Sequence, residues 1–174
     1  HLDRAARMLA REVARFPSPE LVILLGDVYS AAGEPREARR QYSLVRAMAR
    51  LYRAGGVETD LEMALFATDH GDRPAAALRM ARDAYRRRPS IHAADAVAWA
   101  LHAAGRDEQA RRYAREALRL GTRSAMFHFH AGMIALDLDE RAAVRHLRSA
   151  LEINPHFSLV HAPTARRELE RLVP

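Results

Sequence analysis

The stretch LVILLGDVYSAAGEPREARRQYSLV, residues 21–45, decides the fold. It places Gly26 three positions before Tyr29 and then, beyond the turn AAGEP, places Ala38 four positions before Tyr42. A small residue leaves room for a neighbouring helix, and an aromatic residue one helical turn away fills the space beside that contact. The Gly and Pro of the turn separate the two halves. The stretch therefore predicts two helices that pack against each other as a hairpin.

The second half of this pattern recurs along the chain. Its anchor alanines are separated by 33, 39, 33 and 33 residues, and small or apolar residues follow most of them at four and seven positions. Three of the five copies carry a helix-ending Pro twelve positions after the alanine. Such a period predicts an array of helix hairpins, each covering the next. The anchors are Ala5, Ala38, Ala77, Ala110 and Ala143.

The chain resembles the tetratricopeptide repeat (TPR) family over nearly its whole length, and the opening stretch carries the family motif. Its residues Val22, Leu25, Gly26 and Tyr29 follow the family spacing W-x-x-L-G-x-x-Y, and its second half follows A-x-x-x-F. Three departures stand out: Val replaces Trp, the period is one residue short of 34, and the second step contains six extra residues. The resemblance implies an all-α, right-handed superhelix of about four and a half hairpins plus a capping helix, as in a C-terminal or internal TPR array.

The repeats divide the chain as follows. We expect the second helix of a truncated repeat at 1–17, a repeat with a lengthened second helix at 18–54, repeats at 55–89, 90–122 and 123–155, and a capping segment at 156–174. The expected helices are 2–16, 19–32, 35–54, 57–70, 74–88, 91–104, 107–120, 124–137, 140–153 and 163–172, the last beginning at Pro163.

The first expected helix has no partner helix before it. Its apolar stripe should therefore be partly uncovered, and a homodimer through this helix is one way to cover it. The stripe consists of Ala6, Leu9, Ala10 and Val13.

Charge is sorted between the two helices of each hairpin. All 28 basic residues are Arg, and none of them falls in the first-helix windows 19–32, 57–70, 91–104 and 124–137, which hold eight acids. The net charge of +6 accompanies a composition typical of GC-rich coding sequence, so it is weak evidence for nucleic-acid binding. The sequence predicts acidic first helices in a basic protein.

In TPR proteins the first helices line the concave groove, so the resemblance places the candidate binding site there. Acids attract cations, and aromatic faces hold guanidinium or apolar anchors. Two interpretations without a binding role also stay open. Aromatic residues at helical spacing are also typical of buried packing, and an acidic stripe is also typical of a solvated helix face. The candidate peptide-binding residues are Asp27, Glu62, Phe66, Asp69, Asp95, Trp99, His102 and His128, and the same stripe includes Gly132 and Ala135.

The sequence offers little chemistry for an enzyme, a metal or a cofactor, and we expect none of the three. It contains no Cys, which excludes disulfides, thiol nucleophiles and Cys-ligated zinc. Asp95 could orient His102, but no Ser or Cys stands where it could use that base. His128 and His130 point to different helix faces, and His130 reads as a core residue with a hydrogen-bond partner. No stretch approaches the length of a membrane span.

The sequence therefore favours a protein-binding scaffold whose ligand is a segment with basic or apolar anchors. Nucleic acid or another polyanion bound by the Arg-rich second helices is the disfavoured alternative, and self-association is a third. The compartment is unassigned, with the cytoplasm favoured.

Overall fold

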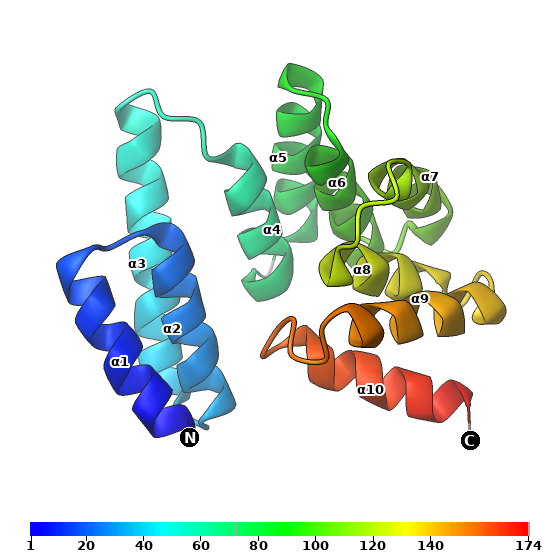
Figure 1. The fold of residues 1–174 in the computed structure, drawn as a ribbon. Helices are drawn as coiled ribbons and strands as arrows, with labels where there is room; N and C mark the ends of the chain where they lie inside the picture. Colours follow the sequence, from blue (N-terminus) through cyan, green and yellow to red (C-terminus); the bar gives the residue numbers. More distant parts are fainter. Residues whose placement is uncertain (72, 174) are drawn as a thin grey trace. The chain divides into compact units, whose positions relative to one another are not determined.

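The computed structural model describes residues 1–71 and 73–173, which form ten α-helices and no strand. Two positions of the expected elements lie outside the described residues: Asp72 in the turn at 69–74, and Pro174 at the end of the capping segment. The chain divides into two compact units, His1–Thr59 and Asp60–Pro174. Each unit is an arrangement of antiparallel helices with its own core (Figure 1).

The first unit contains α1 (Leu2–Arg15), α2 (Pro19–Ala31) and α3 (Pro35–Ala54). The hairpin of α2 and α3 closes where the sequence places its smallest residue. A Cβ atom added at Gly26 would lie 2.5 Å from Cε1 of Tyr42, so only Gly admits the tyrosine ring. The quoted stretch therefore forms the hairpin that its spacing predicts.

Helix α1 packs its apolar stripe on α2. Ala6 is buried in a cluster with Leu25 and Val28 of α2, and the other apolar residues of the stripe are half-buried against the same cluster. Within the chain, α2 thus covers much of this stripe. A homodimer through α1 remains a prediction.

The second unit contains three hairpins and a final helix. These are α4 (Asp60–His70) with α5 (Pro74–Arg87), α6 (Ile91–Ala103) with α7 (Asp107–Leu118), and α8 (Ala125–Ala135) with α9 (Glu140–Ile153), followed by α10 (His161–Leu172). The first helices α4, α6 and α8 contact one another in sequence, and α10 packs on α9.

Local chemistry explains where these helices begin and end. The side chain of Ser90 accepts a hydrogen bond from the backbone N–H of Ala93 at 3.1 Å, and Ser124 caps α8 in the same way at 3.3 Å. Such caps satisfy backbone donors that have no partner inside the helix. After α6, Gly105 has a φ of 68°, which a residue with a side chain adopts at a cost. Capped starts and glycine ends thus recur with the repeat.

The hairpins close through small side chains. Ala77, Ala110 and Ala143 are fully buried, at 0% exposure each. In the last hairpin a Cβ atom added at Gly132 would lie 2.8 Å from the Leu147 side chain. This contact corrects the expectation that Gly132 lies on the groove stripe: it faces α9, the partner helix of its own hairpin.

Two helix starts differ from the sequence expectation by two residues or more. Helix α4 begins at Asp60 and not at residue 57, and α10 begins at His161, two residues before Pro163. The Ser158 hydroxyl accepts from the backbone N–H of His161 at 3.1 Å and so nucleates α10 earlier. Pro163 is tolerated because the first-turn N–H groups have no acceptor within the helix. The division of the chain into repeats remains a prediction.

We predict that Ala110→Leu destabilises the second unit by about 1–3 kcal/mol, because the added atoms overpack a closed helix contact. Urea unfolding followed by circular dichroism measures the change. Gln109→Leu is the control, since Gln109 is exposed on the same helix and should leave the free energy of unfolding almost unchanged. Equal stability of the two variants would contradict the assigned contact.

Candidate functional site

The first helices α2, α4, α6 and α8 contain no Arg, so the charge sorting predicted from the sequence coincides with the helices of the structure. Their acids, however, are mostly engaged within the chain. Asp60 forms an ion pair with Arg87 of α5, and Asp27 accepts a hydrogen bond from the Tyr42 hydroxyl at 2.8 Å. Glu62 is exposed to solvent. The first helices therefore offer fewer available acids than their sequences suggest.

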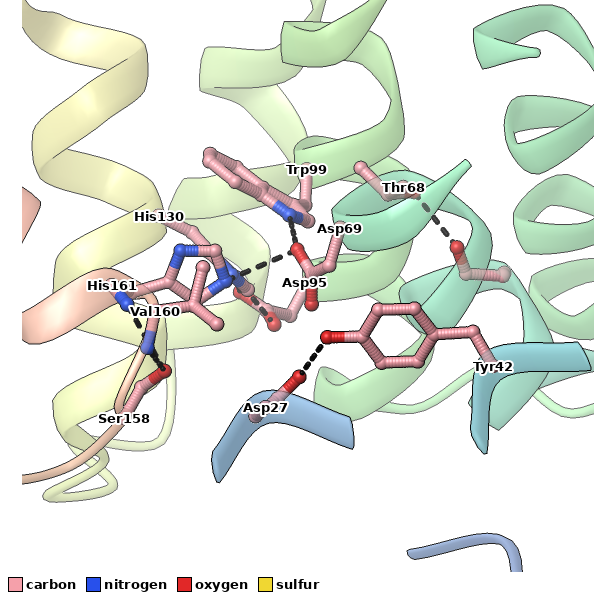
Figure 2. Close-up of polar contacts among 11 residues, drawn as sticks. Asp27, Tyr42, Thr68, Asp69, Asp95, Trp99, His130, Ser158, Val160 and His161 are labelled. Atoms are coloured by element: carbon pink, nitrogen blue, oxygen red, sulfur yellow. Dashed lines mark hydrogen bonds and ion pairs between the residues drawn. The ribbon is translucent and has the colours of Figure 1, made fainter. Parts of the chain in front are cut away.

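Asp69 near the end of α4 joins three elements of the second unit (Figure 2). Its Oδ1 accepts a hydrogen bond from Nε1 of Trp99 on α6 at 2.7 Å. The same oxygen lies 3.1 Å from Nε2 of His161, the first residue of α10. The Asp69 side chain retains 21% exposure, so this carboxylate is the part of the cluster that an incoming group can reach.

Asp95 on α6 pairs with His130 on α8. The His130 Nδ1 atom lies 2.9 and 3.0 Å from the two carboxylate oxygens, and both residues are buried, at 3% and 2% exposure. Because Nδ1 faces both oxygens, it carries the proton that the pair shares. The His130 Nε2 atom is buried without a hydrogen-bond partner among the described residues. This pair ties two first helices together inside the protein.

Trp99 lies between these two polar pairs. Its ring stacks on that of His130 at a centroid distance of 4.3 Å and an interplanar angle of 14°, and on that of His102 at 5.0 Å and 22°. At 8% exposure its faces are covered, and its Nε1–H is used by Asp69. The expectation that Trp99 presents a face to a ligand is therefore not supported, because neighbouring first helices pack on each other and cover it.

The structure brings Asp69, Asp95 and Trp99 together and stacks His102 on Trp99, but His102 and His128 both find polar partners other than the predicted ones. His102 contacts Asp107 of the next helix, with Nδ1 2.6 Å from a carboxylate oxygen, and is not oriented by Asp95. His128 turns toward α9, where its Nδ1 lies 3.1 Å from Nδ1 of His146.

Of the two remaining aromatic and acidic candidates on α4, Phe66 is buried at 4% exposure with its ring 5.2 Å from that of His70. Glu62, two turns before Asp69 on the same helix, is exposed. The exposed part of the predicted stripe on α4 is therefore acidic, and its aromatic member is covered.

Sequence reasoning missed His130 and His161 as parts of the polar cluster. His130 was assigned to the core, which is correct for its burial, but its partner Asp95 was placed on the groove. His161 lies outside the periodic pattern, and its contact with Asp69 spans 92 positions. One signal was available: an acid on a helix that is otherwise apolar, such as α6, needs a buried partner.

The electrostatics of the cluster favour an ionised Asp69. Burial raises its pKa, but the hydrogen bond and charge of His161 and the hydrogen bond from Trp99 outweigh burial and hold its pKa below the ordinary value. At the other pair, burial lowers the pKa of both His128 and His146, so these imidazoles are neutral near pH 7. Asp69 is thus a fixed negative charge beside a rigid aromatic stack.

Two further searches bear on the chemistry of the site. Over residues 1–71 and 73–173, no three His, Asp or Glu side chains converge as metal ligands would. No helix in the described part of the chain is long and apolar enough to cross a bilayer. The cluster consists of hydrogen-bond donors and acceptors that contact one another.

Comparison with known proteins gives a fold. No family model matches the chain, and no curated protein matches it in sequence. Its structure is similar to a chain in the crystal structure of the APC/C hetero-tetramer Cut9-Hcn1, with a TM-score of 0.57 and 15% identity. The match covers 99% of this chain and 40% of that chain. The fold is therefore all-α and TPR-like, and the chain spans about two fifths of the length of the protein it matches.

We predict that Asp69→Asn destabilises the second unit by about 1–3 kcal/mol at pH 7, because a charge-assisted acceptor is lost. The folded pKa of Asp69 is lowered, so its stabilisation is complete above the unfolded pKa near 3.8 and is lost as pH falls through the folded value. Urea titrations between pH 7 and pH 2 should show the variant and the wild type converging in acid. Asp137→Asn, at an exposed acid, is the control.

We predict that Asp95→Ala costs about 3 kcal/mol, because it leaves buried His130 without its partner. Replacing both members of the pair with Leu should recover part of this loss, since no buried polar group then lacks a partner. Thermal unfolding of the wild type and the two variants measures both effects. A double variant less stable than Asp95→Ala would contradict the cost assigned to the unpaired histidine.

Proposed function

We propose that this chain is a protein-binding module that holds a basic segment of a partner against the acidic side of α4 and the start of α10. We call this surface the acidic face; it consists of Glu62, Asp69, Leu159 and Val160. The observation that carries the proposal is the partly exposed Asp69 carboxylate, whose pKa is held low so that it stays ionised.

The contact of Asp69 with His161 supports this proposal. An imidazole N–H from another helix already occupies one side of the carboxylate. A guanidinium or ammonium from a partner can reach the exposed side by the same chemistry, because a carboxylate has about four acceptor positions and Asp69 uses one oxygen for both internal contacts. The charge of the partner segment should therefore be positive.

Apolar side chains flank the same point. Leu159 and Val160 immediately precede His161 and are 40% and 37% exposed. Glu62 lies seven residues before Asp69 and so shares its side of α4. A segment that alternates basic and apolar residues would match the acids of α4 and these two side chains. This refines the sequence hypothesis, with Trp99 now a support for Asp69 and not an anchor.

The test is fluorescence anisotropy with a panel of short labelled peptides that contain Arg and Leu, set against peptides with Glu in place of Arg. We expect the Arg peptides to bind, and affinity to fall as salt rises, because exposed charges are screened over about 8–10 Å. Glu62→Gln combined with Asp69→Asn should weaken binding about tenfold. Glu152→Gln, at an exposed acid of α9, is the matched control and should leave affinity unchanged.

The same assay addresses the polyanion alternative with a labelled single-stranded oligonucleotide. The proposal predicts weak binding that does not depend on the acidic face. If the oligonucleotide binds tightly, the peptides do not bind, and Arg86→Glu with Arg88→Glu abolishes the oligonucleotide complex, the function belongs to the Arg-rich second helices instead.

A further inference from the structure

A pocket of about 180 Å³ lies between α7, α8 and α9 of the second unit, away from the acidic face. Its lining includes small and aliphatic side chains that are buried or half-buried, among them Ala114, Leu118 and Ile134. It also includes Arg111, which is half-buried, and Arg115 and Arg145, which are exposed. The apolar side chains are thus the better covered part of the lining, and the cations mark its more exposed edge.

In the preceding hairpin, tyrosines stand at the positions that correspond to two residues of the pocket lining. Thirty-three residues before Leu118 and His146 stand Tyr85 and Tyr113. The rings of the two tyrosines meet edge to face at 5.6 Å, and the Tyr85 hydroxyl donates to a Glu116 carboxylate oxygen at 2.6 Å. Two aromatic rings therefore meet between α5 and α7, whereas a pocket lies at the corresponding positions of α7 and α9, where leucine and histidine stand.

A third residue of the pocket lining differs in charge from the corresponding residue of the preceding hairpin. Leu78, buried at 6% exposure, stands 33 residues before Arg111. An apolar residue is thus replaced by a cation in the hairpin that has the pocket. A simple loss of core volume does not require an added charge, so the two changes together indicate a recognition site.

Two of the three cations of the pocket lining have no ion-pair partner within the described residues. Among the described residues, neither Arg115 nor Arg145 has an ion-pair or hydrogen-bond partner, and Arg111 pairs with Glu108 at 3.1 Å. The one carboxylate in the lining, that of Asp139, accepts from the backbone N–H of Ala142 as the cap of α9. The side chain that enters should therefore be accompanied by negative charge.

The volume limits the occupant. A cavity of about 150 Å³ accommodates one benzene ring, and pockets for whole small-molecule ligands run from about 300 to 1,000 Å³. At about 180 Å³ this pocket holds one aromatic or branched aliphatic side chain. The Arg side chains of the lining can contact carboxylates that lie next to this side chain in a peptide.

We propose that the pocket between α7, α8 and α9 binds an aromatic or branched aliphatic side chain of a partner protein, within a segment whose neighbouring residues are acidic. The bound side chain lies beside Leu118 and His146, at the positions that Tyr85 and Tyr113 occupy in the preceding hairpin. The carboxylates that flank it contact Arg115 and Arg145. This site has charge opposite to the acidic face and stands or falls independently of the function proposed above.

The test is the affinity of a labelled peptide with one Phe between Asp and Glu residues, measured by anisotropy on the whole chain. Leu118→Tyr with His146→Tyr places tyrosines at both positions and should weaken binding at least about tenfold. Its melting temperature is measured as well, because the second substitution removes the contact between His146 and His128. Arg115→Gln with Arg145→Gln should weaken it by a similar factor. Arg112→Gln with Arg148→Gln removes the same charge from exposed positions of the same helices and should change affinity less than about twofold.

Each other outcome overturns the proposal in a recognisable way. Absence of saturable binding of the peptide to the wild type rejects the site. If both pairs of Arg→Gln variants lose affinity equally, the second helices attract anions without a specific site. If phenylacetate binds as tightly as the peptide, the pocket is a small-molecule site. If the tyrosine variant does not fold, Ala142→Met is measured in its place, because a methionine at this position of α9 fills the pocket. Glu62→Gln with Asp69→Asn should leave this binding intact, which separates the two proposals.

Discussion

Close approach of helices through small side chains is the constraint on which the rest of the structure depends. Gly26 faces the Tyr42 ring, Gly132 faces Leu147, and Ala110 is fully buried between its helices. A larger residue at these points would push the paired helices apart and change the direction of the next hairpin. Because the contact recurs, α4, α6 and α8 come to lie next to one another, and their polar residues meet.

The proximity of α4, α6 and α8 explains why acids of the first helices form hydrogen bonds within the protein. Asp95 finds His130 on the next first helix, and Asp69 finds Trp99 and His161. Burying a polar group is costly unless a partner satisfies it, so acids that look like a ligand-binding stripe in one helix become cross-helix ties. Only the acids at the margin, where no further helix covers them, keep solvent access. The solvent-exposed acidic surface of these helices is therefore smaller than their sequences suggest.

Repetition also lets one hairpin serve as the reference for the next. Residues of α5 and α7 correspond to residues of α7 and α9 at a step of 33 positions. Their side chains differ: Tyr85 and Tyr113 meet between α5 and α7, while a pocket lies where Leu118 and His146 stand. In a repeat protein a local loss of aromatic volume creates a cavity without disturbing the neighbouring helices, because each unit contacts mainly its neighbours.

The sequence by itself determined the helices, their pairing and the absence of Arg from the first helices, since helical period, caps and turns are local properties of the chain. It also marked His130 as a core residue. Only the tertiary structure decided which face each polar side chain uses. A one-residue offset along a helix turns a side chain by about 100°, and whether the resulting direction meets solvent or a neighbouring helix depends on crossing angles that no local pattern encodes. Trp99 is covered for that reason, and the contact between Asp69 and His161 exists because α10 packs on α9 with its first residue beside Asp69.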